Sequence, residues 1–130
     1  MIDDPLAPAV RQLFVDLRHS GTPREPSATA VARLCAGEAG REQRGTRVRF
    51  VLEVMDGGIG AARFAAYGCP HTLAVCEWLC RELEAGRQGS IGRPADWCRT
   101  LGVPIVKLGR LLVVEDALYA AMQHIKSVVK

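Results

Sequence analysis

The clearest pattern along the chain is an alternation of apolar and polar residues near its middle. The apolar positions of this stretch are Val48, Phe50, Leu52 and Val54. A period of two predicts a β-strand with one buried face and one largely exposed face. Asp56-Gly57-Gly58 follows, and these residues accept the positive φ angles of a hairpin turn. Residues 59–67 are therefore predicted to return as an antiparallel strand.

A further strand is predicted earlier in the chain, over residues 28–35. The polar, glycine-containing stretch at 36–45 is expected to form the loop that leads into the hairpin. On this assignment Cys35 lies at the end of a strand.

Helical spacing of apolar residues predicts helices before and after the strands. The first set comprises Leu6, Val10, Leu13, Phe14 and Leu17. It predicts a helix that ends near Gly21. Further helices are predicted over residues 71–85, about 94–101 and about 110–129, with Gly86 and Gly102 following the first two. The predicted fold class is therefore α+β, a three-stranded antiparallel sheet packed against several helices that include a long C-terminal helix.

The size and charge of the chain limit the classes of protein to consider. The 130 residues are enough for one domain, 1–130, that builds a hydrophobic core without disulfides or a structural metal. Because no stretch of about 18 apolar residues is present and the first residues are acidic, we expect a cytoplasmic protein without a membrane partner. A net charge of +3, with no aromatic residues interleaved among the arginines, does not point to nucleic acid.

The chain has five cysteines, an odd number in a sequence with no sign of export. We expect reduced thiols rather than a disulfide framework, and the spacing matches no Cys-x-x-Cys pair. Cys76 and Cys80 fall on the apolar stripe of the predicted helix 71–85, so they are candidates for the core. An i,i+4 metal pair is the alternative for these two residues.

Cys69 is the cysteine whose position most favours a reactive or metal-binding thiol. It lies between the predicted strand 59–67 and the helix that follows. The unpaired amide N–H groups and the positive end of the helix dipole stabilise a thiolate there, and a thiolate binds metal or acts as a nucleophile. A small buried residue at a turn of the chain is the alternative interpretation.

The order of elements, together with Tyr67-Gly68-Cys69 before a helix, resembles the NifU/IscU family of iron–sulfur cluster assembly scaffolds. Residues 13–21 are similar to the opening helix of that family and its exit, and residues 62–69 to its Ala-Arg-Phe-x-x-Tyr-Gly-Cys motif. Residues 103–107 are similar to its Leu-Pro-Pro-Val-Lys segment, and residues 115–117 match the Glu-Asp-Ala opening of its last helix. The resemblance covers nearly the whole chain and implies the same α+β fold.

In that family three cysteines and an aspartate at one tip of the domain hold zinc or a nascent [2Fe-2S] cluster. The resemblance implies that Cys35 and Cys69 are ligands of iron, of a [2Fe-2S] cluster or of zinc. Glu38 lies one residue beyond the position of the aspartate, and His71 is a candidate to fill a vacated ligand position.

Two positions depart from the family pattern, because Gly109 and Arg110 stand where its His-Cys pair is expected. The permanent charge of Arg110 is unfavourable beside a metal cation, so it needs an anionic partner. The resemblance also implies partners: a cysteine desulfurase, apo-protein clients, and an Hsp70-type chaperone that binds through Pro104, Val106 and Lys107.

Three functions follow from these residues, and the first of them, a scaffold or carrier, is the one we expect. In the first, the protein is a scaffold or carrier that binds through Cys35 and Cys69, with missing ligands from Glu38, His71 or the second chain of a homodimer. In the second, it is a regulator or sulfur acceptor that keeps its partner contacts and uses Cys69 without a stable cluster. In the third, it is a cysteine enzyme with His71 as base. A base two residues along a helix points elsewhere, so we do not expect an enzyme.

Overall fold

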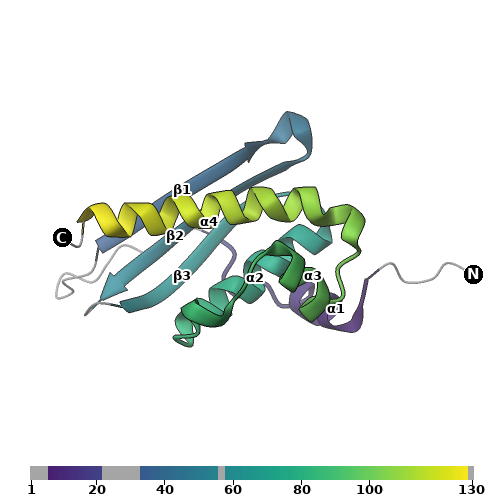
Figure 1. The fold of residues 1–130 in the computed structure, drawn as a ribbon, viewed down its shortest axis with the longest axis horizontal. Helices are drawn as coiled ribbons and strands as arrows, with labels where there is room; N and C mark the ends of the chain where they lie inside the picture. Colours follow the sequence, from purple (N-terminus) through teal and green to yellow (C-terminus); the bar gives the residue numbers. More distant parts are fainter. Residues whose placement is uncertain (1–5, 22–32, 56–57, 129–130) are drawn as a thin grey trace, which may run out of the picture.

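The computed structural model describes residues 6–21, 33–55 and 58–128. In these residues a three-stranded antiparallel sheet of order β1-β2-β3 packs against four α-helices (Figure 1). The elements are α1 (Pro8–Phe14), β1 (Arg33–Arg41), β2 (Thr46–Met55), β3 (Gly58–Tyr67), α2 (Pro70–Glu84), α3 (Pro94–Leu101) and α4 (Leu108–Val128). Short 3-10 helices are η1 (Glu42–Arg44), η2 (Gln88–Ser90) and η3 (Ile105–Lys107). This architecture confirms the predicted α+β class.

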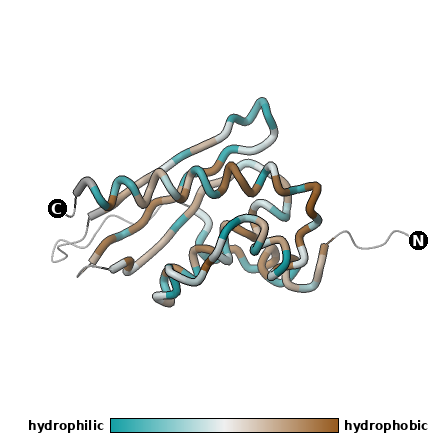
Figure 2. The backbone as a smooth tube through the Cα atoms, viewed as in Figure 1, coloured by the Kyte–Doolittle hydropathy of each residue, from teal (hydrophilic) through white to brown (hydrophobic). Residues whose placement is uncertain are grey.

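One hydrophobic core lies between the sheet and the helices. Helix α4 runs along β1 and β2, while α2 packs on β3 and α1 packs on α2 (Figure 1). The inward-facing residues Val48, Phe50 and Leu52 of β2 are fully buried in this core, whereas Arg47 and Arg49 on the other face of the strand are exposed. Hydrophobic residues gather along β2 and in the N-terminal half of α4, and the β1–β2 turn is hydrophilic (Figure 2).

The hairpin and three of the helices agree with the sequence prediction. Strands β2 and β3 pair antiparallel, with one irregularity between Glu53 and Val54. Helices α2, α3 and α4 lie within two residues of their predicted bounds. The turn residues Asp56 and Gly57 lie outside the described residues.

The first predicted strand is present, but its predicted end was wrong. Residues 28–32 lie outside the described residues, and β1 continues to Arg41 through much of the predicted loop at 36–45. Cys35 therefore lies within a strand, fully buried, and not at a strand end.

Glycine in β1 reflects close packing rather than a loop. A Cβ atom on Gly37 would lie 2.1 Å from the backbone N of Ala121 and 2.4 Å from the carbonyl O of Ala117, so only glycine lets α4 approach the strand this closely. On the adjacent residue, the outward-facing N–H of Ala36 donates to Nδ1 of His124 at 3.1 Å. Helix α4 thus contacts both the face and the edge of β1.

The first helix is shorter than predicted, because it ends at Phe14 and not near Gly21. The chain beyond it pairs with β3 instead. The N–H of Phe64 donates to the carbonyl of His19 at 2.9 Å, and the N–H of Gly21 donates to the carbonyl of Phe64 at 2.8 Å. These tertiary hydrogen bonds replace the last turn of helix that local spacing favours.

No helix within the described ranges is long and apolar enough to cross a membrane.

Candidate functional site around Cys69

Cys69 is the N-cap residue of α2, directly after the end of β3. Its backbone is extended, with φ −80° and ψ 167°, and Pro70 occupies the first helical turn, where its missing N–H costs nothing. The predicted strand-to-helix position of Cys69 is confirmed. Its side chain is partly buried at this junction.

The surroundings of Cys69 favour its thiolate. Partial burial alone would raise the pKa, but the donors around the sulfur outweigh it and lower the pKa from an ordinary 9.0 to about 7. The Thr72 hydroxyl lies 3.5 Å from Sγ, and the guanidinium of Arg110 and the amides of His71 and Thr72 add to the effect. The amides act through their dipoles, since the sulfur forms no cap hydrogen bond. Roughly half of Cys69 is therefore ionised at neutral pH.

Arg110 comes to this site from the first turn of α4. Its side chain is exposed and forms no ion pair with a carboxylate in the described part of the chain. Neighbouring Gly109 is also exposed, and a Cβ atom there would meet no other atom within 4 Å. At the two positions where the NifU/IscU pattern has a His-Cys pair, the structure thus has a glycine without a side chain and a permanent positive charge.

Cys35 does not join Cys69, which corrects the predicted ligand pair. Cys35 is opposite Leu52 of β2, whereas Tyr67, two residues before Cys69, is opposite Arg47. The two β2 positions are separated by five residues, or about 16 Å along the strand. Cys35 is also fully buried, so it cannot complete a site at the end of β3.

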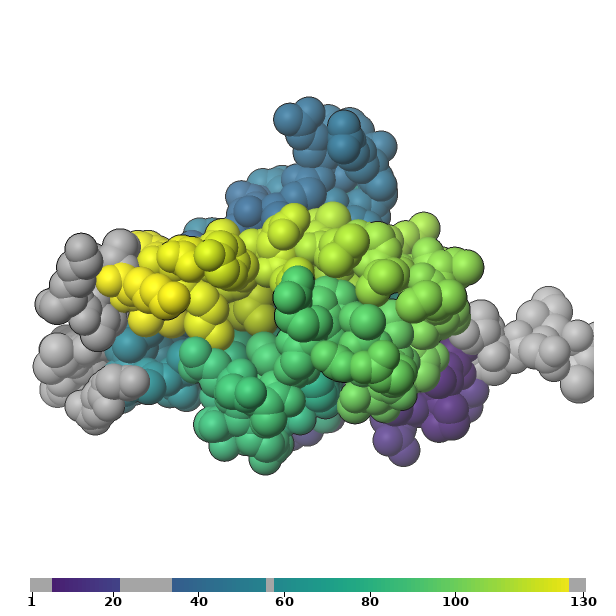
Figure 3. Space-filling view, in the orientation of Figure 1, coloured from purple at the N-terminus to yellow at the C-terminus, as the bar shows by residue number. Residues whose placement is uncertain are grey.

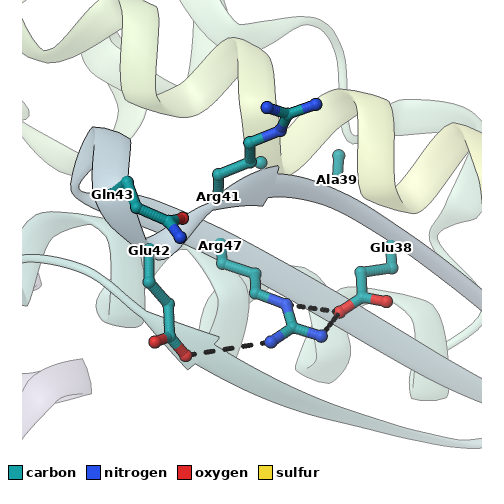
Figure 4. Close-up of a pocket in the computed structure, with 7 residues that line it drawn as sticks. Glu38, Ala39, Arg41, Glu42, Gln43 and Arg47 are labelled. Carbon is teal, nitrogen blue, oxygen red and sulfur yellow. Dashed lines mark hydrogen bonds and ion pairs between the residues drawn. The ribbon is translucent and has the colours of Figure 1, made fainter.

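Of the two other predicted ligands, Glu38 pairs with an arginine and His71 is buried. Glu38 accepts a hydrogen bond from Nε of Arg47 at 2.6 Å, and Glu42 lies 3.8 Å from the same guanidinium (Figure 4). The ring of His71 is buried, with 5% of the residue exposed, rather than facing solvent. Among the residues that the structure describes, no group of three or more His, Cys, Asp and Glu side chains is arranged to hold a metal ion.

Cys76 and Cys80 are fully buried core residues, as predicted. Burial raises the pKa of both thiols, and burial also raises the pKa of Cys98 in α3. Of the thiols whose pKa is shifted, Cys69 alone is activated.

The predicted partner segment is on the surface. Pro104 precedes η3, Val106 is 82% exposed and Lys107 is partly exposed. Ile105 beside them is 65% exposed. The segment is therefore accessible to a partner, and no described contact covers it.

A basic hollow that the sequence did not predict shares Arg110 with the surroundings of Cys69, and we call it the arginine hollow. Arg41, Arg44 and Arg110 line it, between the β1–β2 turn and the start of α4, and its volume is about 460 Å³. Arg41 points toward α4, on the opposite face of the sheet from Arg47 (Figure 4). Arg41 and Arg44 lie close together in the sequence, but local spacing does not show that Arg110 lines the same hollow.

A second polar cluster was also missed, and we call it the His19 cluster: His19, Arg63, Glu77, Arg81 and Glu84. The two ring nitrogens of His19 lie 2.6 Å from a carboxylate oxygen of Glu77 and of Glu84 respectively. Glu77 is fully buried and also accepts from the His19 N–H at 2.8 Å and from Nε of Arg81 at 2.6 Å. Glu84 accepts from the N–H of Ala62 and from Arg63.

Comparison with models of known protein families and with curated proteins gave no match to this chain. The likeness to the NifU/IscU scaffolds therefore rests on the motifs in the sequence alone.

Proposed function

We propose that this protein is a NifU/IscU-like binding module that accepts sulfur on Cys69 from a cysteine desulfurase and holds no stable [2Fe-2S] cluster. The observation that carries the proposal is the setting of Cys69, an N-cap thiol with a pKa of about 7 and the guanidinium of Arg110 beside it. On this proposal the protein is not an enzyme but a partner of one.

A thiolate next to a cation suits sulfur transfer. The Cys69 thiolate attacks the outer sulfur of a persulfide on the desulfurase, a new S–S bond forms, and the cysteine of the desulfurase leaves as its thiolate. The exchange needs no added oxidant, because the sulfur arrives already at the persulfide level. Arg110 then faces the persulfide anion on Cys69, which favours the charged product.

The same setting is unfavourable for a cluster. Iron–sulfur clusters need several soft thiolate ligands around one point, and Cys35 remains in the core about 16 Å away along the sheet. The positive charge of Arg110 also opposes an incoming iron cation. A scaffold or carrier function through iron, a cluster or zinc would need its other ligands from a second chain.

Partner contacts belong to the same proposal. The exposed segment with Val106 and Lys107 offers a docking point for an Hsp70-type chaperone, as the resemblance implies. Reduced thiols suit the cytoplasm, where a desulfurase and its persulfide would be available.

The test has two arms on the native chain, on Cys69→Ser and on Cys98→Ser as a buried-thiol control. In the first arm each chain is incubated with a cysteine desulfurase and free cysteine, and the intact mass is measured. We expect one added sulfur atom on the native and Cys98→Ser chains and none on Cys69→Ser.

In the second arm each chain is reconstituted anaerobically with ferrous iron, sulfide and a reductant, and visible absorption and bound sulfide are measured. We expect colourless protein. Charge-transfer bands that disappear in Cys69→Ser would establish the scaffold function instead, and failure to gain sulfur in the first arm would refute the acceptor function. Gly109→His combined with Arg110→Cys is expected to create a cluster affinity that the native chain lacks.

A further inference from the structure

The arginine hollow has the charge of a binding site. Its lining includes three arginines and no carboxylate. Arg41 and Arg44 form no ion pair within the described ranges. The nearest acidic residue in sequence, Glu42, faces Arg47 on the other face of the sheet (Figure 4). Like charges gathered around one concave surface raise the local potential and attract anions.

The backbone fixes the shape of the hollow. Gly40 has φ +88°, and a Cβ atom there would lie 2.2 Å from the carbonyl O of Thr46, so β1 requires glycine at this point, just before the β1–β2 turn. The turn projects beyond α4 (Figure 3), and on the α4 side Gly109 adds no side chain. The positive end of the α4 dipole lies at the same place. The hollow is therefore held open between two ordered elements.

We propose that the arginine hollow binds a small molecule with at least two oxyanion groups, phosphate or carboxylate. This goes beyond sulfur acceptance by Cys69 and does not depend on it. A guanidinium pairs in bidentate fashion with either group, and three arginines spread over two elements match more than one group. A volume of about 460 Å³ is of the size that holds a small metabolite.

Arg110 connects the hollow to Cys69. Its guanidinium helps to hold the pKa of Cys69 near 7, and a bound anion would compete for the same guanidinium. Occupancy of the hollow should therefore raise the pKa of Cys69 and slow its reactions at neutral pH. Ligand binding in the hollow would thus regulate the reactivity of the thiol.

The experiment is calorimetric titration of the full chain at low salt with pyrophosphate and, separately, with citrate. Both probes carry several oxyanion groups, and they distinguish a phosphate ligand from a carboxylate ligand. The variants are Arg44→Gln in the hollow and Arg49→Gln as a control. Arg49 is exposed on the outer face of β2 and loses the same charge.

We expect saturable binding of at least one probe, about tenfold weaker in Arg44→Gln and nearly unchanged in Arg49→Gln. The bound probe should also slow alkylation of Cys69 by iodoacetamide in the native chain. No binding of either probe, or equal weakening by the two variants, would overturn the proposal. Sulfur transfer to Cys69 is measured separately, so either proposal can fail while the other holds.

Discussion

The His19 cluster and the arginine hollow use charged side chains in opposite ways. In the His19 cluster every cation meets a carboxylate, and Glu77 is fully buried with three donors around it. In the arginine hollow three cations surround an open space without a carboxylate in its lining. The His19 cluster connects the segment after α1 to α2 and β3 through hydrogen bonds and ion pairs. Charge balance thus separates a cluster that stabilises the fold from one that is open to a ligand.

The largest effect should come from removing Glu77, the buried carboxylate of the His19 cluster. Glu77→Ala leaves His19 and Arg81 without their buried acceptor, so we expect the free energy of unfolding to fall by about 3–5 kcal/mol in urea denaturation. Glu82→Ala on the same helix removes a more exposed pair with Arg87 and should cost about 1 kcal/mol or less. Equal losses would mean that the cluster contributes no more than surface charges do.

The next largest effect should be on the pKa of the Cys69 thiol, which shares Arg110 with the arginine hollow. Thr72→Val removes the hydroxyl 3.5 Å from Sγ of Cys69 and should raise the pKa of Cys69 from about 7. A rise of about one pH unit lowers the thiolate fraction at neutral pH about fivefold. The rate of iodoacetamide alkylation as a function of pH measures this shift. A midpoint that stays near 7 in the variant would remove Thr72 from the explanation.

Acid should weaken the His19 cluster, because Glu84 becomes protonated. Partial burial alone would raise the pKa of Glu84, but the N–H of Ala62, His19 and Arg63 lower it below the ordinary 4.5. Because the folded state favours the ionised form, this contribution is present above pH 4.5 and is lost as the pH falls below that value. Glu84→Gln should cost about 1 kcal/mol at neutral pH and progressively less in acid. Unfolding curves of both chains across this range test the sign, and a loss that is constant with pH would contradict it.

The smallest effect should come from Arg110→Gln. Its guanidinium contributes less than Thr72 to the low pKa of Cys69, so we expect alkylation at neutral pH to slow by about threefold or less. Arg49→Gln, which removes an equal charge from the outer face of the sheet, should leave the rate unchanged. Equal slowing in both variants would attribute the effect to net charge rather than to position.

Local sequence signals were enough for much of the fold. Alternation at Val48 to Val54 and the proline and glycine that bound residues 94–101 act within one element, so β2 and α3 were predicted correctly. The loop predicted around Gly37 was wrong, because the reason for glycine there is the backbone of α4, about 80 residues later in the chain. A long-range contact of this kind leaves no trace in local composition.

The site was only partly predictable for the same reason. The position of Cys69 was predicted correctly, because it depends only on the adjacent start of a helix. The sequence does not show that Arg44 and Arg110 line the same hollow. Glu77 did leave a signal. A glutamate directly after Cys76, four positions beyond Leu73 on the apolar stripe of α2, requires hydrogen-bond partners in the core, and His19 and Arg81 supply them.

The hydrogen bond between His124 and Ala36 makes it harder for another copy of the chain to add a strand at the edge of β1. An unpaired strand edge is a template on which another chain can add a strand, and such addition begins many aggregates. At β1 the histidine occupies an outward N–H, and α4 lies against the same strand at Gly37. The β1 edge is thereby made a poor template for edge-to-edge growth of the sheet.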